Sequence, residues 1–298
     1  MNEALPTARR IALAGASGTI GSAVLRRLEA DGHDVTVLPR GILADAVVLA
    51  AALTEVRPEV VISCIASRSG SPKDAQAVDY EANLALLDAA KAAGAGHFIL
   101  LSAICVQRPL LAFQHAKLAF EAVLAASGIG YTIVRPTAFF KSLSGQVKRV
   151  KAGRPFLIFG DGELTRCKPI SDDDLARFIA GCIDNPEAFG KVLPIGGPGP
   201  AISLHEQGKL LFKVAGKPPR FRSISPRIFG YAERILNLGA PFSDFFAEKA
   251  EYVRIARYYA TESMLVLDPK TGTYSADLTP EYGSETLEEH YRRLLAGV

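Results

Sequence analysis

Three glycines recur at every third position near the start of the chain, in a pattern suited to holding a phosphate. Gly15, Gly18 and Gly21 stand between a short apolar run, residues 11–14, and a stretch with helical spacing of apolar residues. The first glycine permits a tight turn, the second lets the backbone approach a pyrophosphate, and the third lets the helix pack on the strand. Free N–H groups at the helix start would then face the phosphates. The motif predicts a dinucleotide site, with a ligand-free glycine-rich turn as the alternative.

An arginine follows the second predicted strand, residues 35–38, and indicates which dinucleotide is bound. A carboxylate at this place binds the ribose 2′-hydroxyl of NAD, whereas Arg40 suits the additional phosphate of NADP. No carboxylate competes at the strand end, so we predict NADPH; a solvated surface arginine is the alternative. Ser67 and Arg68 follow the strand predicted at residues 60–63 and are further candidates, because strand ends line the cofactor crevice. The predicted cofactor contacts are Gly15, Ser17, Gly18, Thr19, Ile20, Gly21, Arg40, Ser67, Arg68, Lys117 and Pro136.

Ser102 and Lys117 are the candidate catalytic residues, and a residue between them narrows the chemistry. In short-chain dehydrogenases a serine and a Tyr-x-x-x-Lys motif perform acid–base work at this place, but here Phe113 replaces the tyrosine. A carbonyl reductase uses that phenol to protonate the developing alkoxide, so ketone reduction is disfavoured. Reduction of an activated C=C bond remains open, because only a carbon then needs a proton. Lys117 either supplies that proton or orients the nicotinamide ribose, and His115 is expected on the helix surface.

Residues 135–141 follow the strand predicted at residues 131–134 and are expected at the reacting end of the cofactor. The backbone near Pro136 would contact the nicotinamide amide. Phe139 and Phe140 would stack on a flat substrate, or else pack in the core between two lobes.

Short apolar strands alternate with helices and would position these residues. The pattern predicts an α/β fold, a doubly wound parallel Rossmann sheet covered on both faces. The strands are predicted at residues 11–14, 35–38, 60–63, 97–101, 131–134 and 192–195. From Ser203 on, the segments are helical, basic and aromatic. We predict an NADP-binding Rossmann domain at residues 8–140 and 170–196, and a smaller, discontinuous C-terminal substrate lobe at residues 141–169 and 197–298.

The composition excludes several classes of protein. The chain has 298 residues, of which 49% are hydrophobic, and its net charge of +3 is too small to indicate nucleic-acid binding. Its apolar runs are shorter than the roughly 20 residues of a membrane span. A mean hydropathy of +0.17 still allows peripheral membrane contact. Four cysteines lack the spacing of a zinc or iron–sulfur site, so no metal site is predicted, and the sequence does not determine the oligomeric state.

Several longer segments resemble one enzyme family, the NADPH-type 3,8-divinyl (proto)chlorophyllide 8-vinyl reductases. The resemblance extends from Arg10 to Leu295, and Phe113 fits this family. The matching segments are residues 101–110, 113–117, 135–142, 159–163, 168–171, 257–264, 267–269, 279–280 and 282–283. The resemblance implies an oxidoreductase of chlorophyll or bacteriochlorophyll biosynthesis. Such an enzyme uses NADPH to turn the 8-vinyl group of a divinyl tetrapyrrole into an ethyl group.

The resemblance also implies a substrate contact and a compartment. The propionate of a tetrapyrrole would need a cation, for which Arg108, Lys141 and Arg166 are candidates, with surface charge as the alternative. Plant members carry transit peptides, whereas the polar first ten residues here lead directly into a strand, so a bacterial cytoplasmic protein is expected. Two other functions stay open: an isoflavone-reductase-like NADPH reductase of another conjugated substrate, and an NADPH-binding sensor or assembly factor without catalysis.

Overall fold

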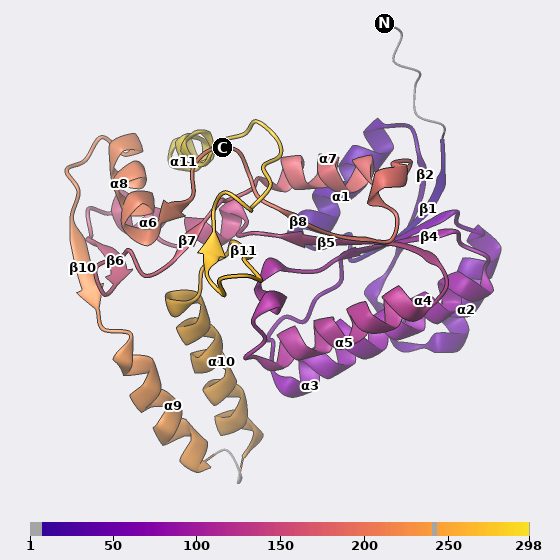
Figure 1. Cartoon of the computed structure of the whole chain (residues 1–298), viewed down its shortest axis with the longest axis horizontal. Helices are drawn as coiled ribbons and strands as arrows, with labels where there is room; N and C mark the ends of the chain where they lie inside the picture. Colours follow the sequence, from indigo (N-terminus) through magenta and orange to yellow (C-terminus); the bar gives the residue numbers. More distant parts are fainter. Residues whose placement is uncertain (1–7, 240–242, 298) are drawn as a thin grey trace, which may run out of the picture.

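The computed structural model describes residues 8–239 and 243–297, and its larger part is a six-stranded parallel sheet with helices on both faces (Figure 1). The strand order is β2 (Asp34–Leu38), β1 (Arg10–Ala14), β3 (Val60–Ser63), β4 (His97–Leu101), β5 (Gly130–Pro136) and β8 (Lys191–Ile195). The winding reverses between β1 and β3, and ligands of such sheets bind outside the carboxyl ends of the strands at this switch point. The predicted fold class is confirmed.

The remaining elements connect these strands and build a second, smaller part. In the sheet region they are α1 (Thr19–Ala30), η1 (Arg40–Ala44), α2 (Ala46–Val56), α3 (Pro72–Asp74), the π-helix η2 (Ala75–Glu81), α4 (Ala82–Ala92), η3 (Ile104–Gln107), α5 (Ala112–Ala126), α7 (Asp172–Gly181) and η5 (Pro186–Ala188). Beyond it they are η4 (Phe140–Ser144), α6 (Val147–Lys151), β6 (Phe156–Phe159), β7 (Arg166–Cys167), β9 (Ile202–Ser203), α8 (Leu204–Val214), β10 (Phe221–Ile224), α9 (Arg227–Gly239), α10 (Asp244–Thr261), β11 (Val266–Leu267), β12 (Tyr274–Ser275) and α11 (Leu287–Ala296).

Both faces of the sheet are buried because successive strand residues point to opposite sides. Ile11 and Leu13 of β1 belong to the core beneath α1 and α7, whereas Ala12 and Ala14 belong to the core beneath α2, α4 and α5. Figure 1 shows these two helix layers on opposite sides of the sheet. This double burial explains why the strands read as continuous apolar runs in the sequence.

Two local features go beyond the sequence-based prediction. The strand expected to end at Val134 continues to Pro136, because Arg135 and Pro136 still pair with β8. The helix before β4 begins as the π-helix η2, a rare form that often marks a functional site. The buried Asn83 amide stabilises this wide turn by donating to the carbonyl of Asp79 at 3.1 Å and to that of Val78 at 3.2 Å.

A second hydrophobic core lies beyond the sheet. It joins η4, α6, β6, α8 and α11 through buried side chains that include Phe140, Phe156, Phe212 and Tyr291. From this part α9 and α10 project side by side (Figure 1). No helix in the described part of the chain is both long and apolar enough to cross a membrane. The predicted lobe limits stay a prediction.

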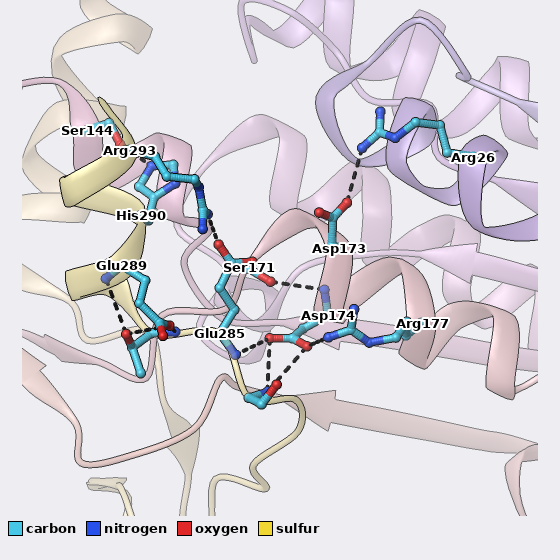
Figure 2. Close-up of polar contacts among 12 residues, drawn as sticks. Arg26, Ser144, Ser171, Asp173, Asp174, Arg177, Glu285, Glu289, His290 and Arg293 are labelled. Carbon is cyan, nitrogen blue, oxygen red and sulfur yellow. Dashed lines mark hydrogen bonds and ion pairs between the residues drawn. The ribbon is translucent and has the colours of Figure 1, made fainter. Parts of the chain in front are cut away.

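A buried carboxylate fastens the C-terminal segment to the sheet region (Figure 2). Asp174 of α7 is fully buried, pairs with Arg177, and accepts the backbone N–H of Glu285 at 3.0 Å and that of Ser284 at 3.3 Å. Gly283 has a φ of +90°, and a Cβ on it would collide with the Asp174 carboxylate. The Asp174 carboxylate, together with the packing of Tyr282 on Phe178, therefore holds the segment that leads into α11 against α7.

We expect Asp174→Ala to lower the free energy of unfolding by about 2–4 kcal/mol, because it leaves two N–H groups without an acceptor. Asp173→Ala is the matched control. Asp173 pairs with Arg26 at 3.1 Å on the surface, where the side chains are 63% and 64% exposed. Its loss should cost less than about 1 kcal/mol. Urea unfolding followed by circular dichroism measures both variants, and equal losses would contradict the role given to Asp174.

Candidate functional site

The glycine turn after β1 is fitted tightly against the end of β3. Gly15 has a φ of +84°, which favours glycine, and a Cβ on it would lie 2.6 Å from the Cys64 carbonyl. A Cβ on Gly21 would overlap the Gly15 carbonyl oxygen. The Gly18 N–H closes the turn by donating to that same oxygen at 3.0 Å. The turn thus forms a cradle of bare backbone, which fits the close approach of a pyrophosphate.

The start of α1 faces the same cradle and has no side-chain cap. Gly18 is the N-cap residue, and within the described residues no side chain accepts a capping hydrogen bond there, nor does the first turn carry an acidic residue. The first N–H groups and the positive end of the helix dipole are therefore available to an anion.

A cavity of about 1460 Å³ opens at this turn. Common small-molecule sites measure roughly 300–1,000 Å³, so this cavity has room for a dinucleotide and part of a second ligand. The predicted residues that line it are Gly15, Ser17, Gly18, Thr19, Ile20, Gly21, Arg40, Arg68, Phe139 and Lys141. They come from segments that follow β1, β2, β3 and β5, whose carboxyl ends meet here.

Arg40 lies on the cavity wall next to β2, where the adenosine ribose of a bound dinucleotide is held in such folds.

Two ionisable groups near Arg40 have shifted pKa values. Asp74, in the segment after β3, accepts hydrogen bonds from the N–H and the hydroxyl of Ser69, both at 2.8 Å. Burial opposes ionisation, but these bonds, the Arg68 backbone and the charge of Arg40 hold the pKa of Asp74 below its ordinary value. On the same wall Cys64 stays a thiol, because burial raises its pKa to about 12.

A long-range hydrogen bond lies in the cavity lining at the start of α1. Lys141 donates from Nζ to Thr19 Oγ1 at 2.6 Å, and the two residues are 122 positions apart in the chain. The ammonium group therefore lies beside the helix N-terminus. There it would face phosphate oxygens, whereas the sequence suggested that it binds a substrate carboxylate.

Lys117 forms a buried ion pair with Asp79 of the π-helix η2. The Lys117 Nζ lies 2.9 Å from Asp79 Oδ1, and the two side chains are 10% and 0% exposed. The Ser67 N–H donates to the same carboxylate oxygen at 3.3 Å, while Asp79 Oδ2 has no hydrogen-bond partner among the described residues. Lys117 and Ser67 do not line the cavity, but Val78, the neighbour of Asp79, does. A lysine ammonium has three donors, of which Asp79 engages one.

Ser102 belongs to a second buried network, which meets α5 at Glu121, one turn beyond Lys117 on the same face of the helix. Its hydroxyl donates to Glu121 Oε1 at 2.5 Å, and Arg135 donates to both oxygens of Glu121. Within the described residues no hydrogen bond joins Ser102 to Lys117. The two candidate catalytic residues each have their own carboxylate partner.

Sequence reasoning missed these two carboxylates, Asp79 and Glu121. A signal for Glu121 was present: Gln114, Lys117 and Glu121 follow at steps of three and four on α5, and all three are buried. Polar residues at the helical period along a buried face indicate that each needs a polar partner in the interior. No spacing pattern identifies Asp79, because its partner Lys117 lies on a different helix, 38 positions away in the sequence.

The two predicted aromatic residues separate in the structure. Phe139 lines the cavity, but Phe140 lies in the second core, where its ring centroid is 5.2 Å from that of His290. A contact between Phe140 and a substrate would require this core to open. Pro136 is buried in β5 and is not among the cavity-lining residues that the structure describes.

Two candidate cations for a substrate propionate lie away from the cavity. Arg108 is exposed and pairs with Glu262 at 3.2 Å. Arg166 pairs with Glu163 at 2.8 Å and with Glu206 at 3.1 Å. Surface ion pairing accounts for both side chains.

A family model matches about half of the chain. Residues 40–186 match a family model described as NAD(P)H-binding. The chain therefore contains an NAD(P)H-binding domain, which confirms the prediction of NADPH as the cofactor.

Curated relatives cover most of the chain. A protein of Cucumis sativus described as "divinyl chlorophyllide a 8-vinyl-reductase, chloroplastic" is 53% identical over 247 residues, which are 81% of this chain and 59% of the cucumber protein. The protein of the same description from Oryza sativa subsp. indica is 45% identical over 321 aligned positions, covering 97% of this chain and 79% of the rice protein.

Solved structures agree on the fold. UDP-glucose 4-epimerase from Thermotoga maritima superposes with a TM-score of 0.68, covering 96% of this chain and 97% of the epimerase. Sequence identity is 19%, so this likeness concerns the fold alone.

The relatives also correct the expected location. Both plant proteins are described as chloroplastic, so the prediction of a bacterial cytoplasmic protein is wrong. That prediction rested on the polar residues that open the chain, and such composition does not determine a compartment. Residues 1–7 lie outside the described part of the structure.

Gly15→Ala should weaken NADPH binding by a factor of about ten or more, because a positive φ and a backbone collision together cost at least about 1–3 kcal/mol. Gly145→Ala is the matched control, since a Cβ there meets open space. Titration of NADPH fluorescence measures both dissociation constants. If Gly15→Ala binds NADPH as tightly as the parent and unfolds at the same temperature, the glycine turn does not bind the pyrophosphate.

Arg40→Ala should weaken NADPH binding by about 10–100-fold and leave NADH binding within about threefold, because only NADPH carries the 2′-phosphate. Arg26→Ala, which removes an exposed arginine on α1, serves as the control. Competition titrations with the two nucleotides give both constants. An equal loss of affinity for NADPH and NADH would show that Arg40 does not bind the 2′-phosphate.

Proposed function

Because the chain belongs to the divinyl chlorophyllide a 8-vinyl-reductase family, we propose that it reduces the 8-vinyl group of a 3,8-divinyl (proto)chlorophyllide to an ethyl group with NADPH. The identity to the rice reductase over nearly this whole chain carries the proposal. Two features of the site support it: a cavity larger than a nucleotide needs, and a phenylalanine at the position where carbonyl reducers carry a phenol.

The residues around the glycine turn would hold the cofactor, which when bound supplies a hydride from its nicotinamide ring. Gly15, Gly18 and the start of α1 bind the pyrophosphate, and Lys141 adds a positive charge beside them. Arg40 binds the 2′-phosphate. The glycine turn, α1 and η1 belong to the sheet region, whereas Lys141 reaches the same place from η4, so both parts of the molecule would orient the nucleotide.

The other end of the cavity is suited to a flat apolar ligand. Leu101 and Phe139 line it beyond the glycine turn, and Phe139 offers an aromatic face on which a macrocycle can stack. The vinyl group is conjugated with the macrocycle, which spreads the negative charge that hydride addition creates. The task of the protein is to align two flat systems and to exclude water between them.

The reaction consumes one hydride and one proton per vinyl group: one vinyl carbon receives the hydride and the other receives the proton. Phe113 has no proton to give, and it packs with the cluster of Ile104, Leu111 and Tyr258. We assign proton supply to Lys117, which Asp79 holds in place at 2.9 Å. Because Lys117 does not line the cavity, its proton would reach the vinyl carbon through an ordered water. Ser102 donates its own proton to Glu121, so towards a water or ligand it acts as an acceptor.

Lys117→Met should lower turnover of divinyl chlorophyllide by about 10²-fold or more while NADPH binding changes little, because a general acid contributes about 10²–10⁴-fold. The blue shift of the Soret band on vinyl reduction measures turnover. Lys91→Met, at the exposed end of α4, is the control.

Removal of Lys117 alone leaves the Asp79 carboxylate buried without its partner, which can prevent folding. The double variant Lys117→Met with Asp79→Asn removes both charges and keeps the volume, so it separates stability from catalysis. If it folds, binds NADPH and still turns over normally, the assignment of Lys117 is refuted. If the parent protein binds NADPH but shifts the Soret band of neither divinyl protochlorophyllide nor divinyl chlorophyllide, the proposed vinyl reduction is refuted. The other functions left open by the sequence, a reductase of another conjugated substrate and a nucleotide-binding sensor or assembly factor, then take its place.

A further inference from the structure

The outer face of α9 exposes large apolar side chains that nothing in the described structure covers. Ile228, Tyr231 and Ile235 are 55%, 64% and 69% exposed. At about 100° per residue they fall within one arc of roughly 60° on the helix surface. Isolated exposed apolar residues are ordinary on protein surfaces, whereas a continuous stripe along one helix indicates an interaction.

The opposite face of α9 makes the contacts that the fold requires. Phe229 packs on Phe159 of β6, with ring centroids 5.4 Å apart. Glu233 faces α10 and pairs with Arg254 at 2.9 Å and with Arg257 at 3.4 Å. The exposed stripe is therefore not needed to hold the hairpin of α9 and α10 together.

The charge beside the stripe indicates what covers it. Arg227 and Arg234 are exposed and lie beside the apolar arc, about 40° and 60° around the helix from Tyr231. In residues 8–239 and 243–297 neither forms an ion pair. Arg222, on the neighbouring strand β10, is also exposed. The one carboxylate of α9, Glu233, is turned towards α10. The outer face of α9 thus combines apolar and cationic groups, which complements a surface that is apolar beneath and anionic on top.

A second copy of the chain is a poorer partner for this face. In a two-fold symmetric contact each helix meets the same face of its partner, so the arginines at the two ends of the stripe would approach those of the other copy. Like charges held in this way disfavour the contact. A lipid surface has no such conflict, because its headgroups supply negative charge and its acyl layer accepts the apolar side chains.

We propose that the outer face of α9, formed by Ile228, Tyr231, Ile235, Arg227 and Arg234, binds the interface of an anionic lipid bilayer and anchors the protein on it. The helix lies in the plane of the interface without crossing the bilayer. Figure 1 shows α9 and α10 projecting from the body of the molecule, so the helix can meet a flat surface without obstruction by the sheet region.

The test is sedimentation of the full chain with vesicles of phosphatidylcholine containing phosphatidylglycerol, and with vesicles of phosphatidylcholine alone. We expect binding to the anionic vesicles that weakens with salt, and at least about tenfold weaker binding to the neutral ones. The triple variant Ile228→Ser, Tyr231→Ser, Ile235→Ser and the pair Arg227→Glu, Arg234→Glu should each lower the partition coefficient by about tenfold or more.

The matched control is Val47→Ser with Leu110→Ser, two apolar residues that are 80% and 60% exposed elsewhere on the surface. This control should bind vesicles like the parent, and NADPH titration of all variants shows that they are folded. Equal binding by the triple variant and the parent overturns the proposal. So does a concentration-dependent dimer in gel filtration that the triple variant loses. No pigment is present in the assay, so its outcome is independent of the proposed reductase activity.

Discussion

The close approach of the Gly15 backbone to the carbonyl group of Cys64 fixes the position of the cofactor crevice. It brings the turn after β1 against the end of β3 at the point where the sheet reverses its winding. The start of α1 is thereby aimed at the crevice, with Arg40 on one side and Lys141 on the other. A side chain at position 15 would push the turn away from β3 and displace the start of α1, to which Lys141 donates a hydrogen bond. The glycine is thus a packing requirement first, and the proposed phosphate site is its consequence.

The reacting end depends on charges that the fold buries. Lys117 with Asp79, and Glu121 with Ser102 and Arg135, lie along α5 in surroundings where an unpaired charge is costly. Apolar residues of equal volume could fill such space, so stability alone does not account for two buried networks. The π-helix η2, stabilised by Asn83, presents Asp79 to Lys117. A lysine fixed in this way keeps an ammonium group at a defined place, which is what a proton donor without a phenol requires.

The α/β class, the glycine turn and the position of Arg40 beside the cavity could be predicted from the sequence, because each depends on residues that are close together in the chain. Each parallel strand could be recognised as a continuous apolar run, because both of its faces are buried. Contacts between distant segments could not be predicted: nothing near Lys141 indicates that it reaches Thr19, and nothing near Asp79 indicates Lys117. Phe139 and Phe140 are adjacent and chemically alike, yet only the first lines the cavity. Their separation is decided by how η4 packs on the second core.

The most direct test of the proposed vinyl reduction follows the hydride from NADPH into the pigment. Protein would be mixed with divinyl chlorophyllide and NADPH deuterated at nicotinamide C4, with each face labelled in turn, and the pigment analysed by mass spectrometry. We expect one of the two labelled forms to place a single deuterium in the new ethyl group, with the second hydrogen coming from solvent. Ethyl product without deuterium from either form, or no product while NADPH is bound, would contradict it.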